Sequence, residues 1–74
     1  MERGPLMDAL SAMIGTDVEL SIILWGEDKP IEIRDVEAVE ELKSSHGLRV
    51  TTGSNYIWID ASHVSAAWQA RSDI

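Results

Sequence analysis

The stretch that decides the fold is VTTGSNYIWIDASHV, residues 50–64. Apolar and polar residues alternate on both sides of residues 53–55, whose Gly, Ser and Asn tolerate the positive φ of a tight turn. Alternation with period two is typical of a β-strand whose two faces meet different surroundings. The stretch therefore predicts a hairpin with strands over 48–52 and 56–60, followed by one tight helical turn over 60–63.

Before the hairpin, the sequence predicts a short amphipathic helix. Five apolar residues recur at helical spacing: Leu6, Met7, Leu10, Met13 and Ile14. They indicate a helix over about residues 5–14, ended by Gly15 in a left-handed conformation. A helix of this length is marginal on its own, so its apolar side must pack against the rest of the chain. Period-two alternation then predicts strands over 18–25 and 64–69.

The segment from Ile31 onward permits two interpretations. A strand begins at Ile31, but its alternation is out of phase from Val36 onward. A β-bulge near Arg34 and Asp35 would absorb the slip and bend the strand sharply. Alternatively, residues 36–45 form a helix, because their Ala, Glu, Leu and Lys residues favour helices. The first interpretation gives a mainly β chain, and the second gives an α+β domain.

Length and composition restrict the class of protein. The 74 residues make one domain, residues 1–74, and we expect residues 1–4 and 70–74 to fray. The chain has no cysteine, which excludes disulfides and thiolate metal sites. The longest uncharged apolar run, residues 20–26, is too short to cross a bilayer, and no signal peptide is recognisable. These features predict a soluble, cytoplasmic protein without contact to a membrane.

The charge is acidic and unevenly distributed. Thirteen acidic residues against six basic ones give a net charge of −7. Residues 17–43 hold nine of the acids and three bases, whereas residues 44–59 hold no acid and one base. Nucleic-acid binding usually depends on clustered Lys and Arg, so the charge disfavours a nucleic-acid partner. An acidic surface suits a basic protein partner instead.

No catalytic or metal-binding motif is present in the sequence. His46 and His63 are the only histidines, and a metal site needs three or four ligands. The serines lack a Gly-x-Ser-x-Gly context, and the glycines form no phosphate-binding loop. We therefore expect no enzymatic activity, no metal and no cofactor.

The aromatic residues are the candidate interface. They are Trp25, Tyr56, Trp58 and Trp68. Alternation places Tyr56 and Trp58 on one face of their strand, with Ile57 and Ile59 on the other. One face can fill a small core, but the other needs the N-terminal helix or a second subunit to cover it. Since Trp is enriched at interaction hot spots, we expect a homo-oligomer.

The order of these elements resembles that of the Sm-like family, one of the SH3-like small barrels. In that family a hairpin with a central Gly is followed by a one-turn helix and a short final strand. Gly53, Ile57, Ile59 and Val64 occupy comparable places here. The resemblance implies a small five-stranded barrel built from a bent sheet, and assembly into rings through edge strands.

Three functions are compatible with these features. The first is an oligomeric assembly or protein-interaction module. The second, implied by the resemblance, is an RNA-binding ring, whose candidate contacts in the acid-free stretch are Lys43, His46, Arg49, Asn55 and Tyr56. RNA-binding Sm-like proteins carry an Asp and an Asn after the second strand, whereas this chain has Glu40 and Glu41 nearest to that place and no Asn there. The third is a binder of small molecules or peptides that uses a Trp-rich face.

Overall fold

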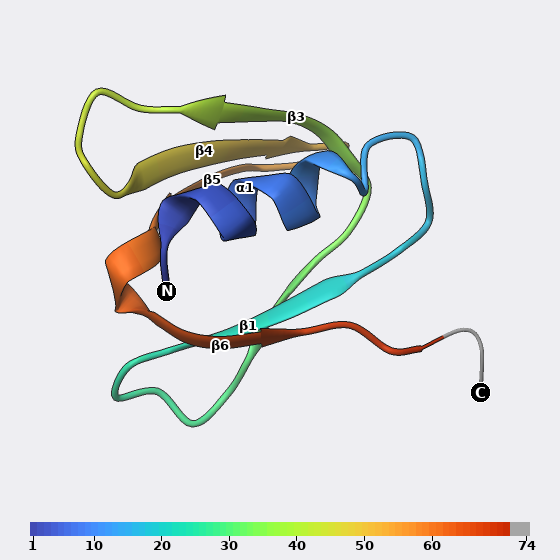
Figure 1. Ribbon diagram of the computed structural model, residues 1–74. Helices are drawn as coiled ribbons and strands as arrows, with labels where there is room; N and C mark the ends of the chain where they lie inside the picture. The colour runs from blue at the N-terminus through green and yellow to red at the C-terminus, as the bar shows by residue number, and fades with distance from the viewer. Residues whose placement is uncertain (72–74) are drawn as a thin grey trace.

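The computed structural model describes residues 1–71, which form one helix and two small antiparallel sheets (Figure 1). The elements are α1 (Arg3–Ser11), β1 (Leu20–Leu24), β2 (Ile31–Ile33), β3 (Val36–Glu41), β4 (Gly47–Thr52), β5 (Tyr56–Asp60), the 3-10 turn η1 (Ala61–His63) and β6 (Val64–Trp68). One sheet has the order β2-β1-β6 and the other β3-β4-β5. The predicted mainly β chain with a short N-terminal helix is therefore confirmed.

The segment from Ile31 onward is bent β structure, and the alternative helix over 36–45 is wrong. β3 pairs with β4 along its length, with a register shift between Val36 and Ala38. Asp35 has φ 54°, a left-handed value that interrupts the extended backbone between β2 and β3. The expected single bent strand is therefore divided in two. As a result, residues 1–71 contain six strands in two three-stranded sheets, where we expected a five-stranded barrel.

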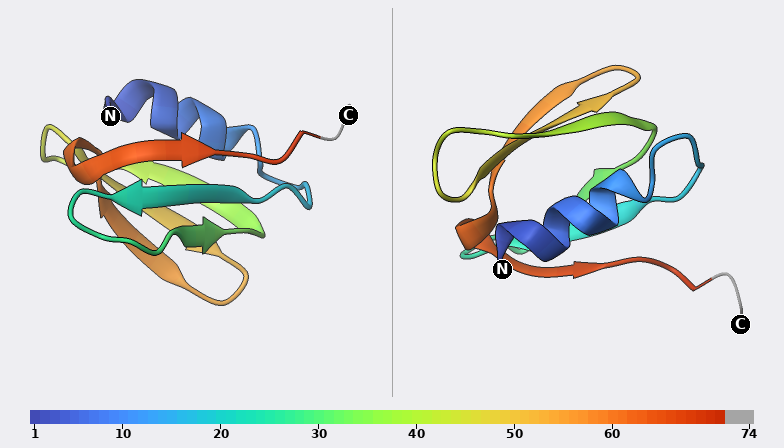
Figure 2. Two further views of the ribbon diagram at one scale, coloured as in Figure 1. Left: turned by 90° about the horizontal axis from the view of Figure 1, so that it is seen from below. Right: turned by 45° about the horizontal axis from the view of Figure 1, so that its top comes forward.

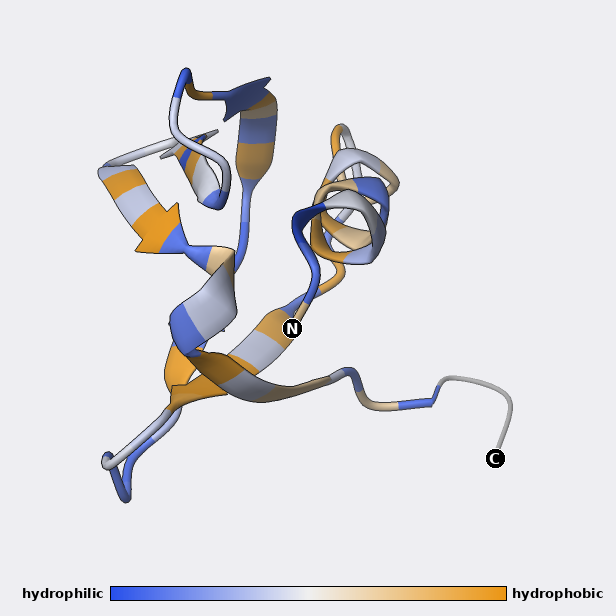
Figure 3. Cartoon of the chain, turned by 60° about the vertical axis from the view of Figure 1, so that its left-hand side comes forward, coloured by the Kyte–Doolittle hydropathy of each residue, from blue (hydrophilic) through white to orange (hydrophobic). Residues whose placement is uncertain are grey.

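The core lies between the two sheets and beneath α1 (Figure 2). Its members come from the inner faces of the strands, from α1 and the turn after it, and from η1: Leu6, Leu10, Met13, Leu20, Ile22, Ile33, Val36, Leu48, Val50, Ile59, Ala61 and Val64. Bands of hydrophobic and polar residues follow one another along the strands, as period-two alternation requires (Figure 3). α1 has no side-chain cap at its start, so packing of its buried residues holds it in place.

Of the two ends that we expect to fray, the structure describes residues 1–4 and residues 70–71. The helix begins at Arg3, and the amino group of Met1 donates to the carbonyl oxygen of Val64 at 2.9 Å. At the other end, residues 70–71 follow β6 outside any strand, and residues 72–74 lie outside the described part of the chain. Across residues 1–71, none of the helical segments has the length and apolar character to cross a membrane.

Candidate functional site

The outer face of the β3-β4-β5 sheet carries an exposed aromatic pair. Tyr56 and Trp58 point outward from β5 and are 62% and 64% exposed, while Ile59 points into the core. The two aromatic ring centroids lie 6.2 Å apart, with the rings tilted by 42°. α1 packs on the inner side of this sheet, so it does not cover the pair (Figure 1). The predicted division of the two strand faces is confirmed.

A charged pair lies beside these aromatic rings. Glu40, Arg49 and Trp58 are direct neighbours across β3, β4 and β5. Arg49 donates from Nη2 to Oε1 of Glu40 at 2.5 Å, and its guanidinium carbon lies 5.4 Å from the centre of the Tyr56 ring. Arg49 is thus balanced by a carboxylate and an aromatic ring, and it adds little free positive charge to the surface.

Asp60 completes this surface at the end of β5. Its Oδ1 accepts hydrogen bonds from the backbone N–H of Ser62 at 2.9 Å and from the Ser62 hydroxyl at 2.6 Å. The hydroxyl bond, helped by the backbone bond and the nearby His63 and His46, lowers the pKa of Asp60. The folded chain therefore favours the ionised form of Asp60. Neither hydrogen bond uses Oδ2, which leaves that oxygen available to an external donor.

We call the surface formed by Glu40, Arg49, Tyr56, Trp58 and Asp60 the outer aromatic face. The sequence indicates Arg49, Tyr56 and Trp58 as candidate contacts, but not the two carboxylates. The alternation in β5 already puts Asp60 on the same face as Trp58, so the position of Asp60 could have been predicted from the sequence. The place of Glu40 depends on the register of β3 against β4, which the sequence does not state.

The edges of the two sheets differ in charge. β2 contributes Glu32 to one edge, and β3 contributes three acids, Glu37, Glu40 and Glu41, to another. β6 has no charged residue, and β5 has only Asp60 at its end. Charged residues on an edge strand oppose pairing with a further strand, so the edges open to pairing are β5 and the part of β6 beyond Val64, whose carbonyl oxygen already accepts from Met1.

Backbone groups of β5 point away from its sheet at alternate residues. Thr52 N–H donates to Asn55 at 2.8 Å before the strand, and Ala61 N–H donates to His46 at 2.8 Å after it. Hydrogen-bonded and non-hydrogen-bonded pairs alternate along an antiparallel ladder. Between these two bonds, the residues of β5 that bond to the backbone of β4 are therefore its two isoleucines, Ile57 and Ile59. The N–H and C=O groups of Trp58 and its alternate neighbours therefore face the free edge.

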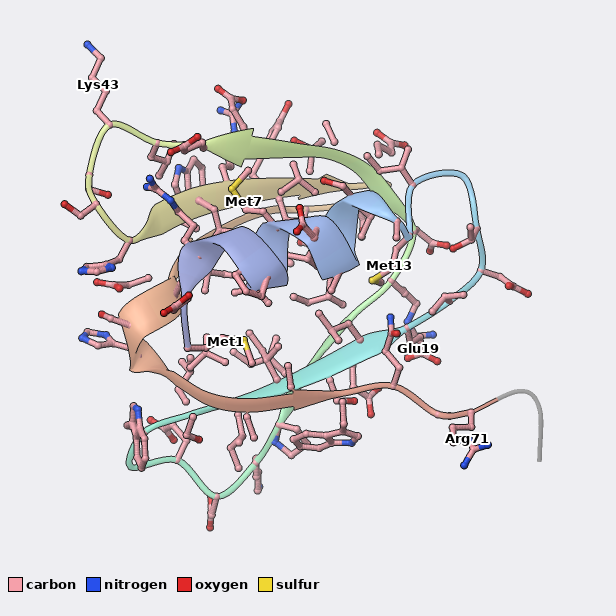
Figure 4. The ribbon with its side chains drawn as sticks, in the orientation of Figure 1. Met1, Met7, Met13, Glu19, Lys43 and Arg71 are labelled. Carbon is pink, nitrogen blue, oxygen red and sulfur yellow. The ribbon has the colours of Figure 1, made fainter. Side chains whose placement is uncertain are left out.

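The structure separates the five candidate RNA contacts. Arg49 and Tyr56 touch, but Lys43 and His46 belong to the β3–β4 loop, from which Lys43 extends into solvent (Figure 4). Asn55 lies in the β4–β5 turn at the other end of the sheet. The six residues of β4 separate the two ends by roughly 17 Å. These side chains do not form one continuous surface.

The four candidate interface aromatics also divide into groups. Trp25 follows β1 and its side chain is 70% exposed, while its backbone N–H donates to the carbonyl oxygen of His63 at 2.9 Å. Trp68 is 46% exposed and lies opposite Ser21, at the far end of the β1–β6 pair. Only Tyr56 and Trp58 are in contact with each other.

No protein-family model matches this chain, and neither does any curated protein or solved structure. Function must therefore be argued from the surfaces themselves. Within residues 1–71, no three His, Asp or Glu side chains gather in a way that could hold a metal ion.

A pocket of about 180 Å³ opens where the chain bends between β2 and β3. It is lined by Glu32, Ile33, Arg34, Asp35, Thr52, Ser54, Asn55 and Ile57. Arg34 shares its charge with Glu19 and Glu32 at 3.4 and 3.5 Å, so this cation is already balanced on the surface. No pattern in the sequence indicates the pocket, because it forms only where the positive φ of Asp35 brings the β4–β5 turn against the bend.

Proposed function

We propose that this chain is a non-catalytic assembly module of the Sm-like type, in which β5 of one copy pairs with β6 of the next. The observation that carries the proposal is the contrast between the edges. The β2 and β3 edges bear acids, whereas β5 and β6 present uncharged residues apart from the terminal Asp60. An uncharged edge strand with free backbone groups is a template for a further strand.

Pairing β5 with β6 satisfies both open edges of every copy. The two strands are the last members of different sheets, and only η1 joins them. Pairing β5 with β5 would leave β6 open. A head-to-tail contact between two different edges forms a closed ring when the rotation between copies allows it. Cytoplasmic location and the Sm-like relationship belong to the same proposal.

RNA binding has less support as a second function. The net charge of −7 repels phosphate, and Arg49, which lies over the exposed Tyr56 ring, is paired with Glu40. The separation of Lys43 from Asn55 further weakens a single RNA-contact surface.

The solution mass tests the proposal directly. Light scattering after size exclusion, at several concentrations and two salt strengths, should give a stable multimer. Ala66→Lys places a charge on the exposed edge strand β6 and should lower the mass without changing the circular dichroism spectrum. Ala12→Lys makes the same change at an exposed position after α1 and should leave the mass unaltered. A monomeric wild-type chain at every concentration would overturn the proposal.

A further inference from the structure

We propose that the outer aromatic face binds an arginine-containing segment of a partner protein, with a guanidinium stacked on Trp58 and paired with Asp60. This goes beyond self-assembly and does not depend on it, because every residue involved belongs to one copy. The pairing of β5 with β6 would use backbone groups at the strand edge. The side chains of the outer aromatic face would remain available beside that contact.

The spacing of Trp58 and Asp60 suits a guanidinium. The two residues are alternate members of β5, so they point to the same side and their Cα atoms are about 6.5–7 Å apart. Trp58 is 64% exposed, and Oδ2 of Asp60 is not used by the bonds from Ser62. A planar cation can therefore lie on the indole and reach the carboxylate in one position.

The chain already contains this kind of contact one strand away. The guanidinium of Arg49 lies between the Glu40 carboxylate and the Tyr56 ring. Trp58 and Asp60 repeat the pairing of an aromatic ring with a carboxylate, but no described cation lies over the Trp58 ring. Within the described residues, Trp58 and Asp60 thus lack a cation such as the one that Arg49 supplies to Tyr56 and Glu40.

Charge decides between possible occupants. Arg49 and Glu40 cancel, so Asp60 gives the outer aromatic face a net negative charge, on a chain of net charge −7. A second copy packed on this face, a nucleic acid or an anionic membrane would each bring further negative charge. A basic protein segment is complementary. Arginine is favoured over lysine because its guanidinium is planar, weakly hydrated and stacks on aromatic rings.

A labelled peptide of alternating glycine and arginine provides the probe. Fluorescence anisotropy at low salt should show saturable binding that weakens as salt is added. The matching lysine peptide should bind more weakly, and the matching glutamate peptide should not bind. Oligouridylate should not bind either, and its binding in place of the arginine peptide would overturn the inference.

Paired variants locate the site. Trp58→Ala should weaken peptide binding about tenfold, and Asp60→Asn, which keeps a residue able to cap η1, about threefold or more. Trp25→Ala and Asp28→Asn make the same changes at exposed positions outside the face and should shift affinity less than about twofold. Equal losses for Trp58→Ala and Trp25→Ala would overturn the inference.

The monomeric background separates this inference from the assembly proposal. All the variants are compared in a chain that also carries Ala66→Lys, so a change in assembly cannot account for lost binding. We expect this chain to bind the arginine peptide with unchanged affinity per copy. A wild-type chain that is monomeric yet binds through Trp58 would reject assembly and keep the inference, whereas a multimer that ignores the peptide would do the reverse.

Discussion

Asp35 holds a left-handed backbone conformation, φ 54°, and its carbonyl oxygen accepts a hydrogen bond from Gly53 N–H at 3.1 Å. This bond ties the bend between β2 and β3 to the turn between β4 and β5. The bend redirects the chain from one sheet into the other. The two-sheet arrangement, and with it the position of the outer aromatic face, therefore depends on a conformation that most side chains avoid.

Substitution of Asp35 tests how much the bend depends on its residue. Asp35→Val should lower the free energy of unfolding by about 1–2 kcal/mol, because a β-branched residue strongly disfavours positive φ. Asp35→Gly should be at least as stable as the wild type, because Gly adopts this conformation without steric cost. Urea denaturation measures both. Equal stability of the Val and Gly variants would show that the bend relaxes instead of being fixed.

The sequence predicted most strands because burial alternates along them. Period-two alternation alone is enough to predict the hairpin around residues 53–55 and the opposite faces of Trp58 and Ile59. The phase slip before Val36 indicates bent β structure as one of two interpretations, and this one is confirmed. That interpretation remained balanced against a helix because the composition of residues 36–45 favours helix formation, and only pairing with β4 decides between them.

The sequence could not predict features that arise from pairing between strands. The complete separation of β2 from β3 follows from one backbone angle at Asp35, and Asp is merely tolerant of that angle. The contact between Glu40 and Arg49 depends on register. The grouping of Lys43 with Asn55 as RNA contacts relied on closeness in sequence, whereas the hairpin carries them to opposite ends of a sheet.

We expect Arg3 to stabilise the packing of α1 against the β3–β4 loop. Its guanidinium donates to the carbonyl oxygens of Leu42 at 3.4 Å, of Gly47 at 3.2 Å and of Ser44, and it also pairs with Glu41. Its side chain is only 18% exposed. Arg3→Ala should lower the free energy of unfolding by about 1.5–3 kcal/mol, since it leaves part-buried carbonyl groups without a charged donor.

Arg34 supplies the control for this prediction. Its side chain is 60% exposed, and its contacts to Glu19 and Glu32 are surface ion pairs. Arg34→Ala should change the free energy of unfolding by less than about 1 kcal/mol. Denaturation of both variants in urea gives the comparison. Equal effects would mean that Arg3 acts only as a surface charge.

Leu10 should be essential for docking α1. It is fully buried, and the helix has no side-chain cap that could hold it independently. Leu10→Ala should cost about 2–5 kcal/mol, the sum of lost burial and a remaining cavity. Thermal unfolding measures the loss, and far-UV circular dichroism should show reduced helix. Trp25→Ala, at a position 70% exposed, should stay within about 0.5 kcal/mol of the wild type.

The hydrogen bonds between Asp60 and Ser62 should make the stability of the folded chain depend on pH. The Ser62 hydroxyl lowers the pKa of Asp60 in the folded chain, so folding favours the ionised carboxylate. The resulting stability is complete above the pKa of Asp60 in the unfolded chain and is lost as the pH falls through the lower folded value. Ser62→Ala should raise the folded pKa of Asp60 toward its ordinary value, because the neutral and ionised forms then differ less in hydrogen bonding.

NMR titration of the Asp60 side-chain carboxyl carbon measures this shift directly. Ser45→Ala removes a hydroxyl from an exposed position in the β3–β4 loop and should leave the pKa of Asp60 where it is. The acid side of the stability curve should be less steep in the Ser62 variant than in the Ser45 variant. If the pKa of Asp60 is the same in both variants, the Ser62 hydroxyl does not stabilise the carboxylate. The backbone N–H of Ser62, together with the nearby His63 and His46, would then account for the lowered pKa, and replacing each histidine with Gln should raise it.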